Sequence, residues 1–188
     1  MQINRLTSLA LLTLMMSSLA CTLFVGGPQL PAATIPVSTE AAGSVEEQMN
    51  QAATAAASSG VMVLSISESQ LTSLLTYRLQ QDADLILTEP QVLLRDGEIQ
   101  IYGKAVRGNL QANIRIALAA SIDSAGRPQI TVTSVDLGPL PAPEGLNNTI
   151  SALVNEAFTG ALGPAALGFR LESIVIADGV MTLTGRVK

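Results

Sequence analysis

Hydrophobic and polar residues alternate between positions 110 and 123, and this pattern predicts one long β-strand. The even positions carry apolar side chains: Leu110, Ala112, Ile114, Ile116, Leu118, Ala120 and Ile122. A period of two places all of them on one face of the strand. At roughly 3.3 Å per residue the strand would be about 45 Å long, whereas strands usually have about five or six residues. We therefore expect this long apolar face to lie against a second layer of structure.

Shorter segments of similar character predict six further strands, at residues 61–67, 85–95, 98–106, 129–138, 169–177 and 180–187. Asp96-Gly97 and Asp178-Gly179 each separate two of these segments, which is typical of tight β-hairpins. Pro90 has no N–H group to donate to a neighbouring strand. It therefore predicts that the segment around it is an edge strand or is bulged at that residue.

Two segments have helical periodicity. Ser67 and Gln70 have the spacing of an N-terminal capping box, and the leucines that follow predict a helix that ends at about Gln81. The second predicted helix, at 146–162, has apolar residues at helical spacing, and Gly163-Pro164 follows it. The order is then β-α-β-β-β-β-α-β-β. This order predicts an α+β fold, a curved, mostly antiparallel sheet of about seven strands with two amphipathic helices packed on one face.

An internal similarity links the two predicted hairpins. The segments LLRDGEIQIYG, at 93–103, and VIADGVMTLTG, at 175–185, align at an offset of 82 residues, and Gly103 then coincides with Gly185. The alignment is consistent with duplication of a strand-helix-hairpin unit. It is equally consistent with the general likeness of Asp-Gly hairpins.

The first 27 residues predict a targeting segment. Arg5 is their only charged residue, an apolar stretch follows it, and small residues precede Cys21. This resembles a bacterial lipoprotein signal peptide, with Cys21 as the lipid-attachment residue. The 22 residues from Leu6 to Gly27 are also long enough for an uncleaved membrane helix, and a plain secretory signal is a third alternative. All three predict an extracytoplasmic location, and the first two predict anchorage to the cell membrane.

The predicted organisation has three parts: residues 1–27 as signal peptide or membrane anchor, 28–59 as tether, and 60–188 as the α+β domain. The tether begins with a proline-rich stretch and continues into an alanine-rich one. Ser44 and Glu47 have the spacing of a capping box there. We therefore expect the tether to contain a stalk helix of modest stability.

The composition excludes several classes of function. The chain has no histidine and one cysteine, so it can form neither a His-dependent nucleophile nor a zinc site of His and Cys ligands. Its net charge of −5 argues against nucleic acid as a partner. Asp82, Asp84 and Glu89 lie close together in sequence but lack the pattern of a calcium loop. We expect no catalytic residues, no metal and no cofactor.

The interior allows two interpretations, because it is aliphatic and only 3% of all residues are aromatic. It is either a core filled by side chains or an apolar groove with room for an acyl chain. If it is a groove, we expect its lining to include Leu75, Ile114, Ile116, Leu118, Leu153, Val154, Ala157 and Phe158.

Five segments together resemble the LmeA- and YpmS-type extracytoplasmic proteins over about residues 61–187. They are SISESQLTSLLTYRL, EPQVLLRDGEIQIYG, GPLPAP, ISALVNEAF and ESIVIADGVMTLTG. The resemblance implies an SMP/TULIP-like fold, in which a curved antiparallel sheet wraps on a long helix and binds phospholipid or a related lipid. It also implies a link to phospholipase activity, although no catalytic residue is carried over by a motif.

The sequence therefore predicts a membrane-tethered domain that binds a lipid without catalysis. Its expected partners are the membrane, through the N-terminal anchor, and a lipid or acyl chain as ligand; no particular protein partner is indicated. Two alternatives stay open, a structural or protein-interaction module of the cell envelope with a packed core, and a lipid hydrolase.

Overall fold

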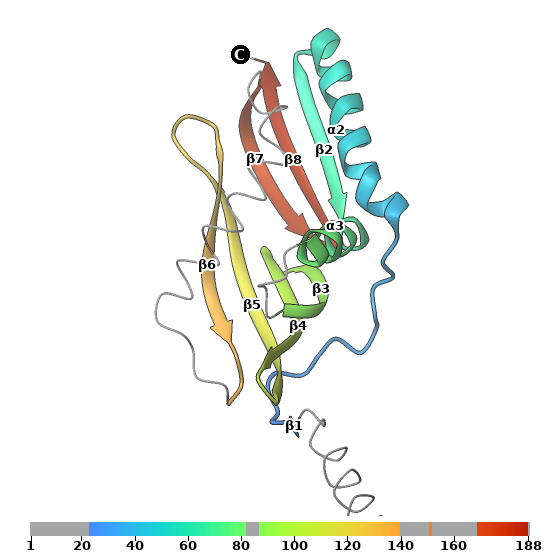
Figure 1. Cartoon of the computed structure of the whole chain (residues 1–188). Helices are drawn as coiled ribbons and strands as arrows, with labels where there is room; N and C mark the ends of the chain where they lie inside the picture. The colour runs from blue at the N-terminus through green and yellow to red at the C-terminus, as the bar shows by residue number, and fades with distance from the viewer. Residues whose placement is uncertain (1–22, 82–86, 140–150, 152–168, 188) are drawn as a thin grey trace, which may run out of the picture.

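The computed structural model describes residues 23–81, 87–139, 151 and 169–187 (Figure 1). Within these ranges it contains two helices and eight strands. They are β1 (Leu23–Phe24), α2 (Thr39–Ser59), β2 (Val61–Ser67), α3 (Glu68–Gln81), β3 (Leu87–Arg95), β4 (Glu98–Arg107), β5 (Leu110–Ile122), β6 (Pro128–Asp136), β7 (Phe169–Ala177) and β8 (Val180–Val187). All seven predicted strands are present, and β1 is an addition to them. The α+β class is confirmed.

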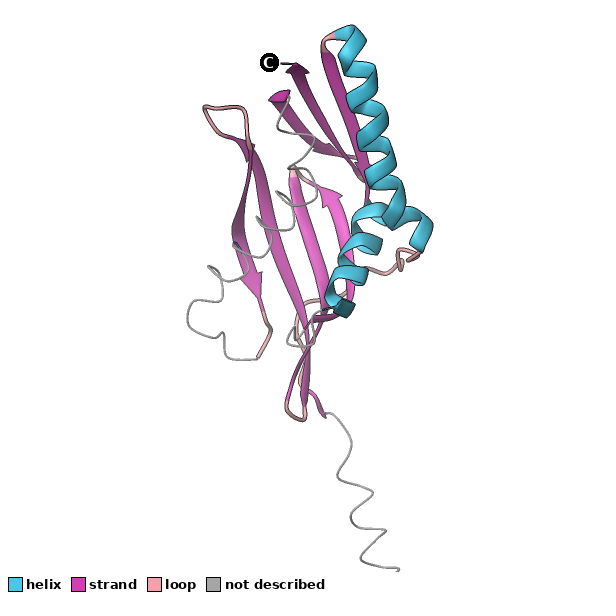
Figure 2. Ribbon diagram, turned by 45° about the horizontal axis from the view of Figure 1, so that its top comes forward, coloured by secondary structure: helices cyan, strands magenta, loops and turns pink. Residues whose placement is uncertain are grey.

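Hydrogen bonding divides the strands into two sheets. β6, β5, β4 and β3 are antiparallel neighbours, and the short β1 pairs in parallel with the start of β5 on its β6 side. β2, β8 and β7 form the second, antiparallel sheet. Main-chain N–H groups of Leu171 and Gly179 join the sheets by donating to the carbonyls of Gly126 (3.0 Å) and Leu94 (3.2 Å). The result is a curled, mostly antiparallel arrangement (Figure 2).

One hydrophobic cluster fills the inside of this curl. It combines the even face of β5 with side chains of β3, β4, β2 and β8 and with residues of both helices. Its most deeply buried members include Leu94, Leu118, Ile130, Met181 and Leu183. The apolar face that the sequence predicts for β5 therefore packs within the same core as the second sheet.

The two Asp-Gly hairpins have the same geometry. All four turn residues have positive φ, at 56° and 76° for Asp96 and Gly97 and at 52° and 77° for Asp178 and Gly179, as two-residue hairpin turns require. The similarity extends to a bulge in the first strand of each hairpin, opposite Gly103 in one and Gly185 in the other. A Cβ at either glycine would lie within 3 Å of a carbonyl oxygen of the bulged strand, at 2.9 Å and 2.8 Å. The bulge in β3 follows Thr88, so the expectation from Pro90 is confirmed.

The alanine-rich helix begins earlier than predicted and belongs to the fold. Ser38 rather than Ser44 is its N-cap, and the Ser38 hydroxyl accepts a hydrogen bond from Ala41 N–H. α2 lies alongside β2 (Figure 1), and its residues Val45, Met49 and Ala56 are buried in the core cluster. A stalk that stands apart from the domain would leave these side chains in solvent, so the structure corrects this expectation.

Residues 25–38, which we call the strap, connect β1 to α2. The Asn113 side chain donates to the Pro28 carbonyl (3.2 Å), the Ile35 N–H donates to Gln91 (2.6 Å), and the Ser38 N–H donates to Ser73 (3.1 Å). The proline-rich part of the predicted tether is thus bonded to the sheet and to α3 along its length.

The second predicted helix, at 146–162, lies outside the described residues except for Ser151, which is helical. Most of the predicted targeting segment, residues 1–22, also lies outside them. Across the described part of the chain, no helix combines the length and the hydrophobicity needed to cross a membrane.

Candidate functional site

The predicted lining residues of β5 are core residues. Ile114, Ile116 and Leu118 are only 1–6% exposed and belong to the hydrophobic cluster, and Leu75 is half-buried against it. None of these four lines the three pockets described below. Leu153, Val154, Ala157 and Phe158 lie outside the described residues, as does Cys21.

A different surface forms a groove, which we call the apolar groove. Its volume is about 670 Å³. It lies between the strap, the C-terminal half of α3 and the start of β3, and its lining residues are Leu30, Pro31, Thr34, Ile35, Pro36, Val37, Thr76, Leu79, Gln80, Leu87, Thr88, Glu89, Pro90 and Gln91. Most of these side chains are apolar, and pockets for small molecules commonly have volumes of about 300–1,000 Å³.

The groove depends on two hydrogen bonds that hold the strap beside α3 and β3. Gln91, on the bulged strand, accepts from Ile35 N–H, and Ser73, which is fully buried on α3, accepts from Ser38 N–H. The Gln91 amide also donates to the Pro90 carbonyl at 3.0 Å, which fixes its orientation. The three elements are therefore linked on both sides of the groove.

The groove has one charged side chain among its described lining residues, Glu89. Lys104 Nζ lies 2.6 Å from its Oε2, so the charge is paired at the rim. Glu89 also has a φ of 50°, a conformation that is uncommon for a non-glycine residue, and the bulge next to Pro90 explains it. With its one charge neutralised, the groove favours an uncharged, apolar ligand segment over a charged one.

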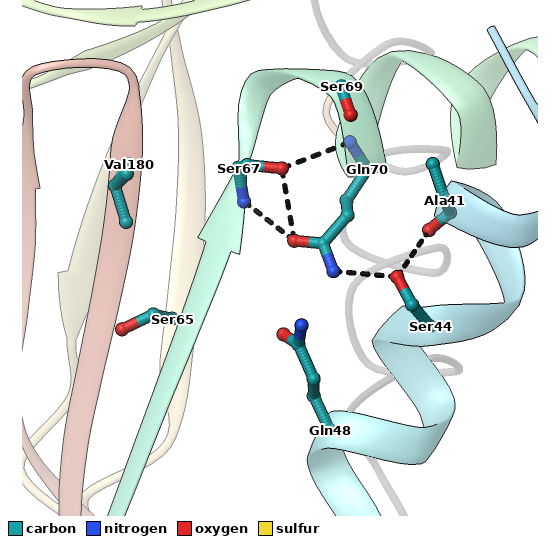
Figure 3. A pocket seen from close by; sticks show the side chains of 8 residues that line it. All are labelled: Ala41, Ser44, Gln48, Ser65, Ser67, Ser69, Gln70 and Val180. Carbon is teal, nitrogen blue, oxygen red and sulfur yellow. Dashed lines mark hydrogen bonds between the residues drawn. The ribbon is translucent and has the colours of Figure 1, made fainter.

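A second, polar pocket lies between α2 and β2 (Figure 3). Its volume is about 440 Å³, and its lining residues are Ala41, Ser44, Gln48, Ser65, Ser67, Ser69, Gln70 and Val180. Gln70 is buried at 7% exposure; its amide oxygen accepts from Ser67 N–H and its amide nitrogen donates to Ser44 Oγ. These bonds confirm the predicted capping box and also tie the start of α3 to α2. A third hollow is bounded by side chains of α2 alone, so no second element completes a site there.

The other polar residues do not assemble a reactive centre in the described part of the chain. No group of three or more His, Cys, Asp or Glu side chains there could hold a metal ion. Arg115 lies over the Tyr102 ring, with 5.9 Å from the guanidinium carbon to the ring centroid. Asp123 is held in the turn between β5 and β6, where hydrogen bonding from the Arg127 main chain lowers the pKa of its carboxyl. Neither residue lines the two pockets between elements.

Sequence patterns did not indicate either pocket. The apolar residues between Leu30 and Val37 were the available signal for the groove, since a freely solvated tether has no need of Ile35 or Val37. The comparisons with known proteins add no further guide to the site. A scan against protein-family models gave no match, and a search of curated proteins gave none either.

Proposed function

We propose that this protein is a membrane-tethered extracytoplasmic domain that binds the hydrocarbon chain of a phospholipid or a related lipid, without catalysis. The apolar groove is the observation that supports this function best. The groove is lined mostly by aliphatic and proline side chains, and its single charge is paired with Lys104. Each methylene group transferred from water into such a groove contributes about 0.8 kcal/mol, so a chain segment alone supplies useful affinity.

The position of the groove along the chain also supports the proposal. Leu30, its first lining residue, follows Cys21 by nine positions. Nine residues of fully extended chain span at most about 30 Å. An anchor at or before Cys21 therefore keeps the groove within reach of the membrane surface from which a lipid would enter.

The proposal is tested by photocrosslinking in vesicles. The full chain is reconstituted in phosphatidylglycerol vesicles doped with a phosphatidylglycerol that carries a diazirine at the end of one acyl chain. After irradiation, mass spectrometry maps the crosslinked peptides. We expect crosslinks in residues 30–37 and 76–91, because both segments line the groove. Crosslinks confined to residues 1–27 would contradict the proposal, since an anchor alone explains them.

A matched pair of variants makes this test specific. Val37 lines the groove and is 42% exposed, whereas Val175 is 56% exposed on β7 and does not line it. Val37→Trp fills groove volume and is expected to reduce crosslinking at 76–91 by more than about half, while Val175→Trp leaves it unchanged. Equal yields in the two variants would show that the lipid lies elsewhere.

The envelope-scaffold alternative has one observation in its favour, the close packing of the interior around β5. Ile114, Ile116 and Leu118 are almost fully buried. If this alternative holds, no acyl crosslink forms within the domain. The hydrolase alternative instead predicts release of free fatty acid from the same vesicles.

A further inference from the structure

Exposed apolar side chains gather at one end of the sheet, where β1 lies beside the start of β5 (Figure 1). Leu23 and Phe24, which form β1, are 64% and 55% exposed, and Leu110 at the start of β5 is 39% exposed. Leu23 is paired with Leu110 in the parallel ladder. Because successive side chains of a strand point to opposite faces, Leu23 and Leu110 share one face and Phe24 lies on the other. This end of the sheet is therefore apolar and exposed on both faces.

No charged residue accompanies these side chains at the end of the sheet. We call residues 23–26 and 108–111 the β1 tip, and none of them is charged. Lys104, further along β4, is paired with Glu89 at 2.6 Å. Single exposed apolar residues are common on protein surfaces, but a cluster of them at a turn is typical of a binding surface. The β1 tip therefore suits an apolar partner and offers little to a charged one.

The chain that precedes the β1 tip indicates which partner covers it. Residues 1–22 contain the apolar stretch of the predicted targeting segment, and Cys21 precedes Leu23 by two positions. Two residues of fully extended chain span at most about 7 Å. A lipid on Cys21, or a membrane helix that ends there, therefore holds the β1 tip at the surface of the bilayer.

β1 is attached directly to β5, without a flexible linker between it and the fold. The N–H groups of Leu23 and Val25 donate to carbonyls of the β4–β5 turn and of β5, at 2.6 and 2.8 Å, and the Asn113 N–H donates to the Gly26 carbonyl at 2.9 Å. A Cβ on Gly27 would overlap the Asn113 carbonyl oxygen, so the two main chains are in contact. An anchor before β1 therefore holds the whole sheet, and its orientation is transmitted to the domain.

We propose that the β1 tip inserts Leu23, Phe24 and Leu110 into the interface of the lipid bilayer and thereby fixes the orientation of the domain on the membrane. Apolar side chains make this contact, so it forms on neutral lipid as well as on anionic lipid. The strap begins at the same tip, so the apolar groove is held at a constant distance from the bilayer. The proposal rests on the membrane anchorage in the proposed function, but not on lipid binding in the apolar groove.

Tryptophan fluorescence tests the proposal, because the chain has no tryptophan of its own. Leu110→Trp places the reporter on the β1 tip, far in sequence from the anchor. Val61→Trp is the control, since Val61 is 40% exposed and begins β2, at the opposite end of the molecule from β1 (Figure 1). Each full chain is reconstituted in phosphatidylcholine vesicles with and without bromine in the upper part of the acyl chains.

The expected result is a difference in quenching between the two reporters. Bromine should lower the emission of Leu110→Trp by about half or more, since interfacial side chains lie at the boundary of headgroups and acyl chains. The emission of Val61→Trp should not change. High salt should leave both results the same, because no charge at the β1 tip takes part in the contact.

A second pair of variants separates the β1 tip from the anchor. In the Leu110→Trp chain, Leu23→Asp combined with Phe24→Asp should remove about half or more of the quenching, because carboxylates resist transfer out of water. Val61→Asp combined with Val63→Asp is the control. It places the same charges at exposed positions of β2 and should leave the quenching unchanged. Circular dichroism verifies that all these chains are folded.

Flotation of the vesicles separates failure of this proposal from failure of the anchorage. A chain that floats with the vesicles, but whose Leu110→Trp reporter is quenched no more than Val61→Trp, would keep the anchorage and overturn the orientation. Stronger quenching at Val61→Trp would place the opposite end on the bilayer. Protection of Leu110→Trp from aqueous iodide without quenching by bromine would identify a protein surface, such as a second copy of this chain, as the partner. A chain that does not float would overturn the anchorage and this proposal together.

Discussion

The edges of β2 and β3 both lie beside a helix, yet the helices bond only the terminal outward donors of β2, at Val61 and Ser67, whereas at β3 a helix bonds the donors of Val92 and Leu94 within the strand. At β3, the Val92 N–H donates to Thr72 Oγ1 and the Leu94 N–H donates to Glu68 Oε1, both at 2.9 Å. At β2, the outward N–H groups of Val63 and Ser65 have no such acceptor among the described residues. The difference shows that a neighbouring helix alone does not complete a strand edge.

Spacing explains why α3 can complete the β3 edge. Glu68 and Thr72 are four residues apart, which is about 6 Å along a helix, and both lie on one helical face. Val92 and Leu94 are two residues apart, which is about 6.6 Å along a strand. The two side-chain acceptors therefore match the two main-chain donors. On α2, the buried face carries Val45, Met49 and Ala56, which have no oxygen in their side chains.

The largest expected effect is a contrast in amide exchange between the two edges of the unliganded protein. Val92 and Leu94 should exchange only when the structure opens, whereas Val63 and Ser65 should exchange from the native state. For a domain stable by about 5 kcal/mol or more, the rates then differ by at least about 1,000-fold. The rates are measured by NMR after transfer to D₂O. Similar rates at all four amides would remove the distinction between the edges.

Thr72→Val should give the largest loss of stability among single substitutions at these edges. Thr72 is fully buried, and valine keeps its shape while removing the acceptor for the Val92 N–H. An unsatisfied buried donor costs about 1–3 kcal/mol, measurable as a lower urea midpoint with an unchanged m-value. Thr76→Val is the control, because the Thr76 hydroxyl only donates back to the Thr72 carbonyl in the same helix. An equal loss in the control would contradict the role assigned to Thr72.

Substitutions of Glu68 test which of its two contacts stabilises the β3 edge, the hydrogen bond from Leu94 N–H or the ion pair with Arg95. Its Oε1 accepts from Leu94 N–H and lies 3.7 Å from Arg95 Nε, a longer contact to an exposed side chain. Glu68→Gln keeps an acceptor and is expected to cost less than about 0.5 kcal/mol, because exposed ion pairs contribute little. Glu68→Ala removes the acceptor and is expected to cost about 1–2 kcal/mol. If both variants lose the same stability in urea unfolding, the ion pair is the more important contact.

Local signals explain why so much of this fold is predictable. The Asp-Gly turns, the Ser67–Gln70 capping box and the alternation in β5 each depend on residues close together in sequence. The bond from Val92 to Thr72 spans 20 residues, and that from Ile35 to Gln91 spans 56. No local pattern encodes such pairs, so neither the completed β3 edge nor the attachment of the strap could be derived.

The candidate site was less predictable than the fold for a related reason. Alternation in β5 identifies a buried face, but a packed face and an open one have the same pattern. Ile114, Ile116 and Leu118 are consequently well-predicted core residues that line no described pocket. The prolines of the strap indicate irregular structure, and irregular structure can still be bonded to the domain and line a groove. Leu30 and Val37 line a groove only because α3 and β3, which are distant in sequence, lie beside them.

The smallest expected effect concerns Ser59, whose hydroxyl accepts the outward N–H of Val61 at the start of β2. The Ser59 hydroxyl accepts from Val61 N–H, and its one proton can be donated to the carbonyl oxygen of Ala55 or to that of Val61, which lie 3.0 Å and 2.9 Å from Oγ. Because the site is exposed, Ser59→Ala should change the free energy of unfolding by no more than about 0.5 kcal/mol. It should nevertheless accelerate exchange at Val61 toward the rates of Val63 and Ser65. Ser58→Ala, which removes a hydroxyl bonded only to Ala55, should leave Val61 unchanged. Acceleration in both variants would mean that fraying at the end of α2 exposes Val61, and that Ser59 does not close the edge.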